Sequence, residues 1–222
     1  MGTSVPFFYL HKLIMAFPTT NAAQELPAVN EILASVGQAP VTTLDQTNPD
    51  VAIAYDTLLN VSREVQAEGW TFNTEEYYPM TPDANGEIPI PNNILQIDLH
   101  DEKDNQYETI RRSGKLYEKI NHTFDWTTLT GWDTVRCDIV WLFDWVDLPR
   151  PIQDYIVAKT AAIVSSRIVG DPQQFQILSQ RELDTRSKAM QYECTQGDYT
   201  FFGHKRGEKT YDAYKPYQAL YR

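Results

Sequence analysis

Two adjacent stretches decide the fold, because each carries the pattern of an amphipathic helix. They are residues 20–44 (TNAAQELPAVNEILASVGQAPVTTL) and residues 45–73 (DQTNPDVAIAYDTLLNVSREVQAEGWTFN). In the first part, apolar residues recur at spacings of three and four, which places them on one helix face. They are Leu26, Val29, Ile32, Leu33 and Val36. Thr20 or Asn21 can cap the start of this helix, and Gly37 predicts its end.

The second part predicts another helix, with Asn48 as its cap and Pro49 at its first position. Gly69 predicts where this helix ends. Its apolar stripe consists of Val51, Tyr55, Leu58, Leu59 and Val65. On spacing alone, the two segments fit a helical hairpin in the core of any protein.

A second pair of helices is predicted near the other end of the chain. Residues 148–172 (LPRPIQDYIVAKTAAIVSSRIVGDP) predict a helix that stops at Gly170, and Asp171-Pro172 predicts the capped start of the next one. This last helix should run to about Cys194. The side chains expected to form its packed stripe are Phe175, Leu178, Leu183, Arg186 and Met190.

Between the two pairs, the helical period disappears and short strands are predicted instead. Residues 83–86 (DANG) have the composition of a turn, and residues 100–105 (HDEKDN) that of a solvated connection. Ser113-Gly114 predicts the turn of a β-hairpin. The strand-like segments are 70–73, 77–78, 94–99, 107–112, 115–120, 121–126 and 135–143. The pattern indicates a small antiparallel β region.

These patterns predict an α+β fold, in which a four-helix bundle of two helix pairs carries an antiparallel β domain inserted between the pairs. We assign the bundle to residues 20–69 and 149–196, and the β domain to residues 70–148. Residues 1–19 form an N-terminal extension, and residues 197–222 form an extended C-terminal arm. A chain of 222 residues is long enough to bury such a core.

The composition is that of an ordinary globular protein with an acidic charge. The formal net charge is −11, so tight binding of DNA phosphates is not expected. No apolar run approaches the roughly 20 residues of a membrane span. The acidic side chains Asp98, Asp101, Glu102 and Asp104 lack the spacing of a calcium-binding loop, and we interpret them as a solvated turn.

Two further features of the sequence are its cysteines and its N-terminal segment. Cys137 and Cys194 have no CxxC spacing and no nearby histidine, so we expect two buried, inert thiols without a disulfide or a metal. The apolar N-terminus precedes a second methionine, Met15. We interpret Met15 as the natural start; the rival interpretation is an apolar arm, at residues 1–14, that docks on a neighbouring subunit.

The C-terminal arm combines aromatic and basic side chains. Residues 195–222 carry five basic and three acidic side chains, a net charge of +2, and seven aromatic side chains. Disordered segments are poor in aromatic residues, whereas interfaces are enriched in them and in Arg. We expect the arm to bind a partner subunit or the portal protein. The alternatives are packing on its own domain and stacking on nucleic acid bases. The candidate binding residues are Tyr199, Phe201, Phe202, Lys205, Arg206, Tyr211, Tyr214, Tyr217 and Tyr221.

The amino-acid sequences of three segments resemble those of a known family. AVNEILASVGQAPVTTL (28–44), EGWTFN (68–73) and the segment 148–172 are similar to the tail tubular protein A family, the tail adaptors or gatekeepers of short-tailed podoviruses. The resemblance extends over about residues 20–196, is specific at both ends and is weak in the β region. It does not reach the C-terminal arm.

The resemblance implies a structural protein of the virion tail that assembles in the host bacterial cytoplasm. It implies a ring of twelve subunits below the portal protein that receives the nozzle, tail tubular protein B, close to where tail fibres attach. Viral DNA would pass through the ring without specific binding. No cofactor, metal or membrane partner is expected, because the sequence has no motif for a cofactor or a metal and no apolar run of membrane-spanning length.

Catalytic motifs are missing from the sequence. It has no Gly-rich phosphate loop, HExxH or G-x-S-x-G, and its four histidines, His11, His100, His122 and His204, lie far apart. A pair of acids could still serve a polysaccharide hydrolase, with Glu75/Glu76 or Asp98/Asp101 as examples. Because no catalytic motif is present, we expect that the protein is not an enzyme. The alternatives are a tail-associated polysaccharide hydrolase and a head-completion connector of another phage type.

Overall fold

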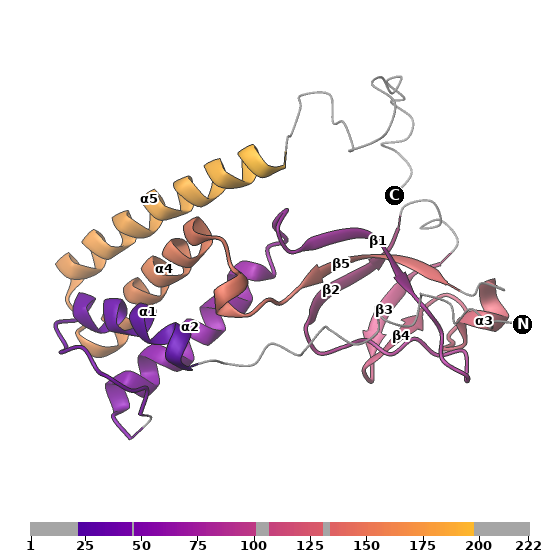
Figure 1. The fold of residues 1–222 in the computed structure, drawn as a ribbon, viewed down its shortest axis with the longest axis horizontal. Helices are drawn as coiled ribbons and strands as arrows, with labels where there is room; N and C mark the ends of the chain where they lie inside the picture. Colours follow the sequence, from indigo (N-terminus) through magenta and orange to yellow (C-terminus); the bar gives the residue numbers. More distant parts are fainter. Residues whose placement is uncertain (1–21, 46, 101–106, 131–133, 198–222) are drawn as a thin grey trace, which may run out of the picture.

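The computed structural model describes residues 22–45, 47–100, 107–130 and 134–197. Helices gather at one end of an elongated molecule and strands at the other (Figure 1). The fold is therefore α+β, as predicted. The expected N-terminal caps Thr20 and Asn21 lie outside the described residues, as do residues 1–19 and 198–222. The predicted domain boundaries and the grouping of the helices into two pairs stay predictions.

The long helices are α1 (Ala22–Ser35), α2 (Pro49–Gln66), α4 (Arg150–Ile168) and α5 (Pro172–Gln196). α4 packs against the three others. Among the described residues, no helix has the length and apolarity that crossing a membrane requires.

Capping side chains define where the helices begin. Asn48 Oδ1 accepts a hydrogen bond from the Asp50 backbone N–H at 3.1 Å, and Pro49 opens α2. Asp171 Oδ1 accepts from the Gln173 N–H at 3.0 Å, and Pro172 opens α5. Both caps satisfy an N–H that a helix start leaves without an intrahelical partner. Both starts agree with the sequence prediction.

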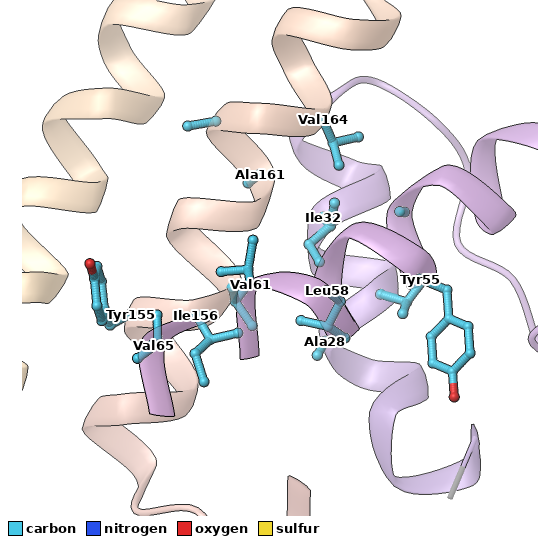
Figure 2. Packing of buried hydrophobic residues seen from close by; sticks show 14 of the residues in the cluster. Ala28, Ile32, Tyr55, Leu58, Val61, Val65, Tyr155, Ile156, Ala161 and Val164 are labelled. Carbon is cyan, nitrogen blue, oxygen red and sulfur yellow. The ribbon is translucent and has the colours of Figure 1, made fainter. Parts of the chain in front are cut away.

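The helical core is built from the apolar stripes that the spacing predicts. Figure 2 shows side chains from α1, α2 and α4 meeting in it. The predicted residues of α1 and α2 that are buried there are Val29, Ile32, Leu33, Val36, Val51, Tyr55, Leu58 and Val65. Each fully buried aliphatic side chain contributes about 1.5–3 kcal/mol, so this core is the main source of stability in the helical region.

The strands form two small antiparallel sheets. The first has the order β1-β5-β2, with β1 (Thr74–Met80) and β2 (Ile94–Leu99) on either side of β5 (Val135–Trp141). The second is the hairpin of β3 (Thr109–Arg112) and β4 (Lys115–Glu118). A second core lies here, around Trp126, Ile139 and Trp141. The predicted strand 94–99 and the predicted hairpin are confirmed.

Two predicted strands are wrong, and local side-chain hydrogen bonds explain why. Residues 70–73 form a turn, in which Asn73 Oδ1 accepts from the Trp70 N–H at 2.9 Å. Residues 121–126 lead into α3 (Trp126–Thr130), where Asp125 Oδ1 accepts from the N–H groups of Thr127 and Thr128. Asn and Asp side chains compete with strand pairing in this way.

Two buried amide side chains join the helices to the first sheet. Gln66, at the end of α2, exchanges hydrogen bonds with the backbone of Phe143, at 2.8 Å from the Phe143 N–H and 3.2 Å to the Phe143 carbonyl. Asn73 Nδ2 donates to the carbonyls of Gln66 and Trp141, at 2.9 and 2.8 Å. Both side chains are fully buried. We call this pair the amide clamp, because it holds the end of α2 to the end of β5.

We predict that Asn73→Ala destabilises the protein by about 2–4 kcal/mol, because it leaves buried backbone groups without partners. The exposed Asn60, in the middle of α2, is the matched control. Asn60→Ala should be neutral or slightly stabilising, since Ala is the better helix former. Urea unfolding followed by circular dichroism and by tryptophan fluorescence measures both. Equal unfolding midpoints for the two variants would contradict the clamp.

Candidate partner-binding surfaces

All nine binding residues predicted in the C-terminal arm lie outside the described residues, but the point where the arm leaves the fold is described. Glu193, in the last turn of α5, is buried. Its carboxylate accepts hydrogen bonds from the backbone N–H of Thr71, at 2.9 and 3.1 Å, and from the Thr71 hydroxyl. The start of the arm is therefore fixed beside the turn that follows α2.

The outer face of α5 is the first candidate surface. Of its predicted packed stripe, Leu178 is buried, whereas Phe175 and Met190 are exposed and Leu183 is 61% exposed. The expectation that these side chains pack within the chain is therefore wrong. Leu183 and Met190 are seven residues apart, on one side of the helix, and they lie outside both hydrophobic cores. Apolar side chains grouped in this way are typical of a protein–protein contact.

The second candidate surface surrounds Trp145, in the short helix η2 (Trp145–Asp147) between β5 and α4. Trp145 lines a groove of about 350 Å³, whose other walls come from the first turns of α1 and of α4. Val146, 57% exposed, also lines it. Trp145 lines in addition a cavity of about 70 Å³ that residues of α2 help to form. We call the two together the Trp145 groove.

Acidic side chains line much of the Trp145 groove. Glu31 and Asp154 belong to its larger part, and each pairs with a basic side chain, Arg181 and Arg150 respectively. Glu25 and Asp144 belong to its smaller part, together with Arg63. A groove with both apolar walls and carboxylates suits a partner with aromatic and basic side chains.

Glu25 is the unusual member of this surface. It is only 4% exposed, and within the described part of the chain its Oε2 atom has no hydrogen-bond partner. Burial raises the pKa of the Glu25 carboxyl, a hydrogen bond with Tyr55 lowers it, and the nearby charge of Asp144 raises it, with a net upward shift. A buried carboxylate without a full set of partners is costly. The site is therefore poised to accept a donor.

A histidine–aspartate pair lies at the far end of the first sheet. His100, predicted in a solvated connection, is instead 5% exposed, and its Nδ1 lies 3.0 Å from Asp138 Oδ1. The Tyr77 ring stacks on the imidazole, with 3.5 Å between centroids, and the Tyr77 N–H donates to Asp138. Tyr77 has a φ of 60° at an irregularity of β1. The pair thus holds a strained bulge in place.

This pair has the geometry of two members of a catalytic triad, but the neighbouring thiol cannot complete it. Cys137 is buried in β5, and burial and the charges of Asp138 and Asp98 raise its thiol pKa to about 12. A thiol with that pKa is a poor nucleophile at neutral pH. The prediction of a buried thiol is confirmed for Cys137 and wrong for Cys194, which is exposed.

The acid pairs considered as hydrolase candidates are exposed where the structure describes them. Glu75 and Glu76 lie exposed on β1. Asp98, also exposed, accepts a hydrogen bond from the Leu99 N–H, and its proposed partner Asp101 lies outside the described residues. Within the described part of the chain, no three His, Cys, Asp or Glu side chains gather in a way that could hold a metal ion.

Comparisons with known proteins match most of the chain. A family model described as tail tubular protein matches residues 26–199. Tail tubular protein A of Klebsiella phage KP34 is 31% identical over 144 residues, which cover 64% of this chain and 71% of that relative. The family match includes most of α1 and all of α2, α4 and α5, together with the sheets between them.

We predict that Glu25→Gln stabilises the isolated chain at neutral pH. Because the folded-state pKa of Glu25 is raised, its favourable contribution is complete below pH 4.5 and is lost as pH rises through the folded-state pKa. The variant should therefore exceed the original in free energy of unfolding at pH 7 and match it below pH 4.5. Urea unfolding across this range, with the exposed Glu76→Gln as control, measures the difference. A gain independent of pH would refute this account.

Proposed function

Because the chain belongs to the tail tubular protein family and is thus a structural component of the bacteriophage virion tail, we propose that it is a ring-forming adaptor. In this proposal, twelve copies form a ring that joins the portal protein to the tail nozzle, tail tubular protein B, close to the tail fibres. The ring forms part of the channel through which viral DNA leaves the capsid.

The observation that carries the proposal is the exposed apolar face of α5. A closed ring needs two different contact faces on each subunit, so that one copy can bind the next head to tail. α5 has 25 residues and is about 38 Å long at 1.5 Å per residue. It lies along one edge of the helical region (Figure 1). A long helix with apolar side chains on its outer side suits the contact between neighbouring subunits.

Charge supports a passive channel over a DNA-binding surface. The formal net charge of −11 disfavours tight binding to phosphates, which depends on neutralisation by Lys and Arg. A wall that does not hold DNA lets it slide. The acidic net charge of the chain thus agrees with a protein that surrounds the genome during ejection.

We predict that the purified chain forms rings and that Leu183→Asp combined with Met190→Asp prevents their formation. Two carboxylates buried in the contact between subunits would be strongly unfavourable. Electron microscopy of the chain, alone and mixed with the portal protein of the same genome, shows rings and their symmetry, and sedimentation measures the mass in solution.

Ile177→Asp is the matched control, because Ile177 is 71% exposed on α5 but points to another side of the helix. It should leave ring formation unchanged. Circular dichroism should show the same helix content for all variants. A chain that stays monomeric and never joins the portal would contradict the adaptor proposal.

A further inference from the structure

We propose that the Trp145 groove is the docking site for residues 198–222 of the aromatic and basic arm of a neighbouring copy of this chain. The inference rests on the proposed ring, because it needs a second copy beside the first. It assigns an occupant to the groove on the face that, in such a ring, lies next to the α5 side of the neighbouring copy.

The groove and the arm have complementary chemistry. Four carboxylates line the groove, against the guanidinium groups of Arg63 and Arg150 in its wall and that of Arg181, which pairs with Glu31. The arm has five basic side chains against three acidic ones, and seven aromatic side chains. Pro27, Val146 and Val157 give the larger part of the groove an apolar surface for aromatic rings. Aromatic and basic side chains are the ones that anchor protein interfaces most often.

Glu25 supplies the specific feature. Its buried Oε2 atom has no hydrogen-bond partner among the described residues, and Glu25 forms part of the wall of the smaller cavity, as does Asp144. A Lys or Arg side chain from the arm would provide both the missing hydrogen bond and the opposite charge. Such a charge-assisted hydrogen bond is about twice as strong as a neutral one.

The geometry favours the arm of a neighbour over the arm of the same chain. Gln153 and Val157 of α4 line the groove. Tyr155 lies between them in sequence. It is about 200° around α4 from each of them, so it faces the side of the helix opposite the groove. Arg186 of α5 lies over the Tyr155 ring, so the last part of α5 and the start of the arm are on that other side, whereas Arg181, earlier in α5, reaches Glu31 at the groove. Figure 2 shows Tyr155 towards α5 and Ala28, another groove residue, away from it.

In a head-to-tail ring, opposite faces of neighbouring copies meet. The face where one arm begins would then lie next to the groove face of the following copy. The arm of 25 residues can span at most about 85 Å when fully extended, which is ample for a contact with an adjacent subunit.

The test places a photo-crosslinking amino acid at Val146 of the full-length chain. Labelled (¹⁵N) chains carrying the crosslinker are mixed with unlabelled chains without it, assembled, irradiated, digested and analysed by mass spectrometry. We expect labelled groove peptides joined to unlabelled peptides from residues 198–222. The same crosslinker at Ile177, exposed elsewhere, should not capture these peptides.

A second variant tests the charge. Glu25→Gln should lower the capture of the arm by about tenfold, the loss expected for one hydrogen bond to a charged group. Misfolding would not explain this loss, because we expect this substitution to stabilise the isolated chain at neutral pH. The exposed Glu76→Gln should leave the capture unchanged.

Four results would overturn the inference. The crosslinker could capture the arm of the same labelled chain, residues 1–21 or the portal protein, or it could capture nothing. If rings form while one of these results is obtained, the adaptor proposal stands and only the docking site is wrong. If no ring forms with or without the portal protein and no neighbour's arm is captured, both proposals fail.

Discussion

The amide clamp, in which Gln66 and Asn73 hold the end of α2 to the end of β5, is the constraint on which the rest of the structure depends. It lies at the place where the chain passes from helices to strands and back again. Asn73 satisfies the carbonyls of Gln66 and Trp141, so the last turn of α2 and the last residue of β5 are held together. Buried polar groups that are satisfied in this way fix one arrangement of the elements around them.

Both candidate surfaces are positioned by the residues next to this clamp. Thr71 lies two residues before Asn73 and binds Glu193, which fixes the end of α5 and the start of the arm. In the segment that follows β5, the Phe143 N–H donates to Gln66, and Trp145 follows two residues later. The start of the arm and the groove that we assign to a neighbouring arm are thus fixed relative to one another by a single junction.

Much of the fold could be predicted from sequence because local signals agreed with tertiary packing. Asn48-Pro49 and Asp171-Pro172 start helices by themselves, and apolar side chains at helical spacing predict a buried face. The turn at 70–73 was missed because an alternating pattern describes a strand equally well. The hydrogen bond from the Trp70 N–H to Asn73 Oδ1 and the tertiary partners of Asn73 distinguish the two, and neither is visible in the apolar pattern. The burial of His100 was missed for the same reason, since Asp138 lies 38 residues away in sequence.

The candidate surfaces were harder to predict than the fold. The spacing of Phe175, Leu183 and Met190 indicates an apolar stripe, but not whether the same chain or another one covers it. Hydrophobic periodicity reports only that a face prefers to be buried. The Trp145 groove has no sequence signal at all, because Glu25, Asp144 and Arg63 come from three separate segments.

Glu25 connects the stability of the single chain with its assembly. A carboxylate with raised pKa and an oxygen without a partner reduces stability at neutral pH, and an amide of the same shape would avoid that cost. The cost is offset only if a positively charged group reaches Glu25 in the assembled state, where the ion pair would lower the pKa of the carboxyl again. The same residue would then weaken the free subunit and strengthen the ring. That difference favours the assembled form over the free chain, and it makes the preference for the ring larger as pH rises through the pKa of Glu25 in the free chain.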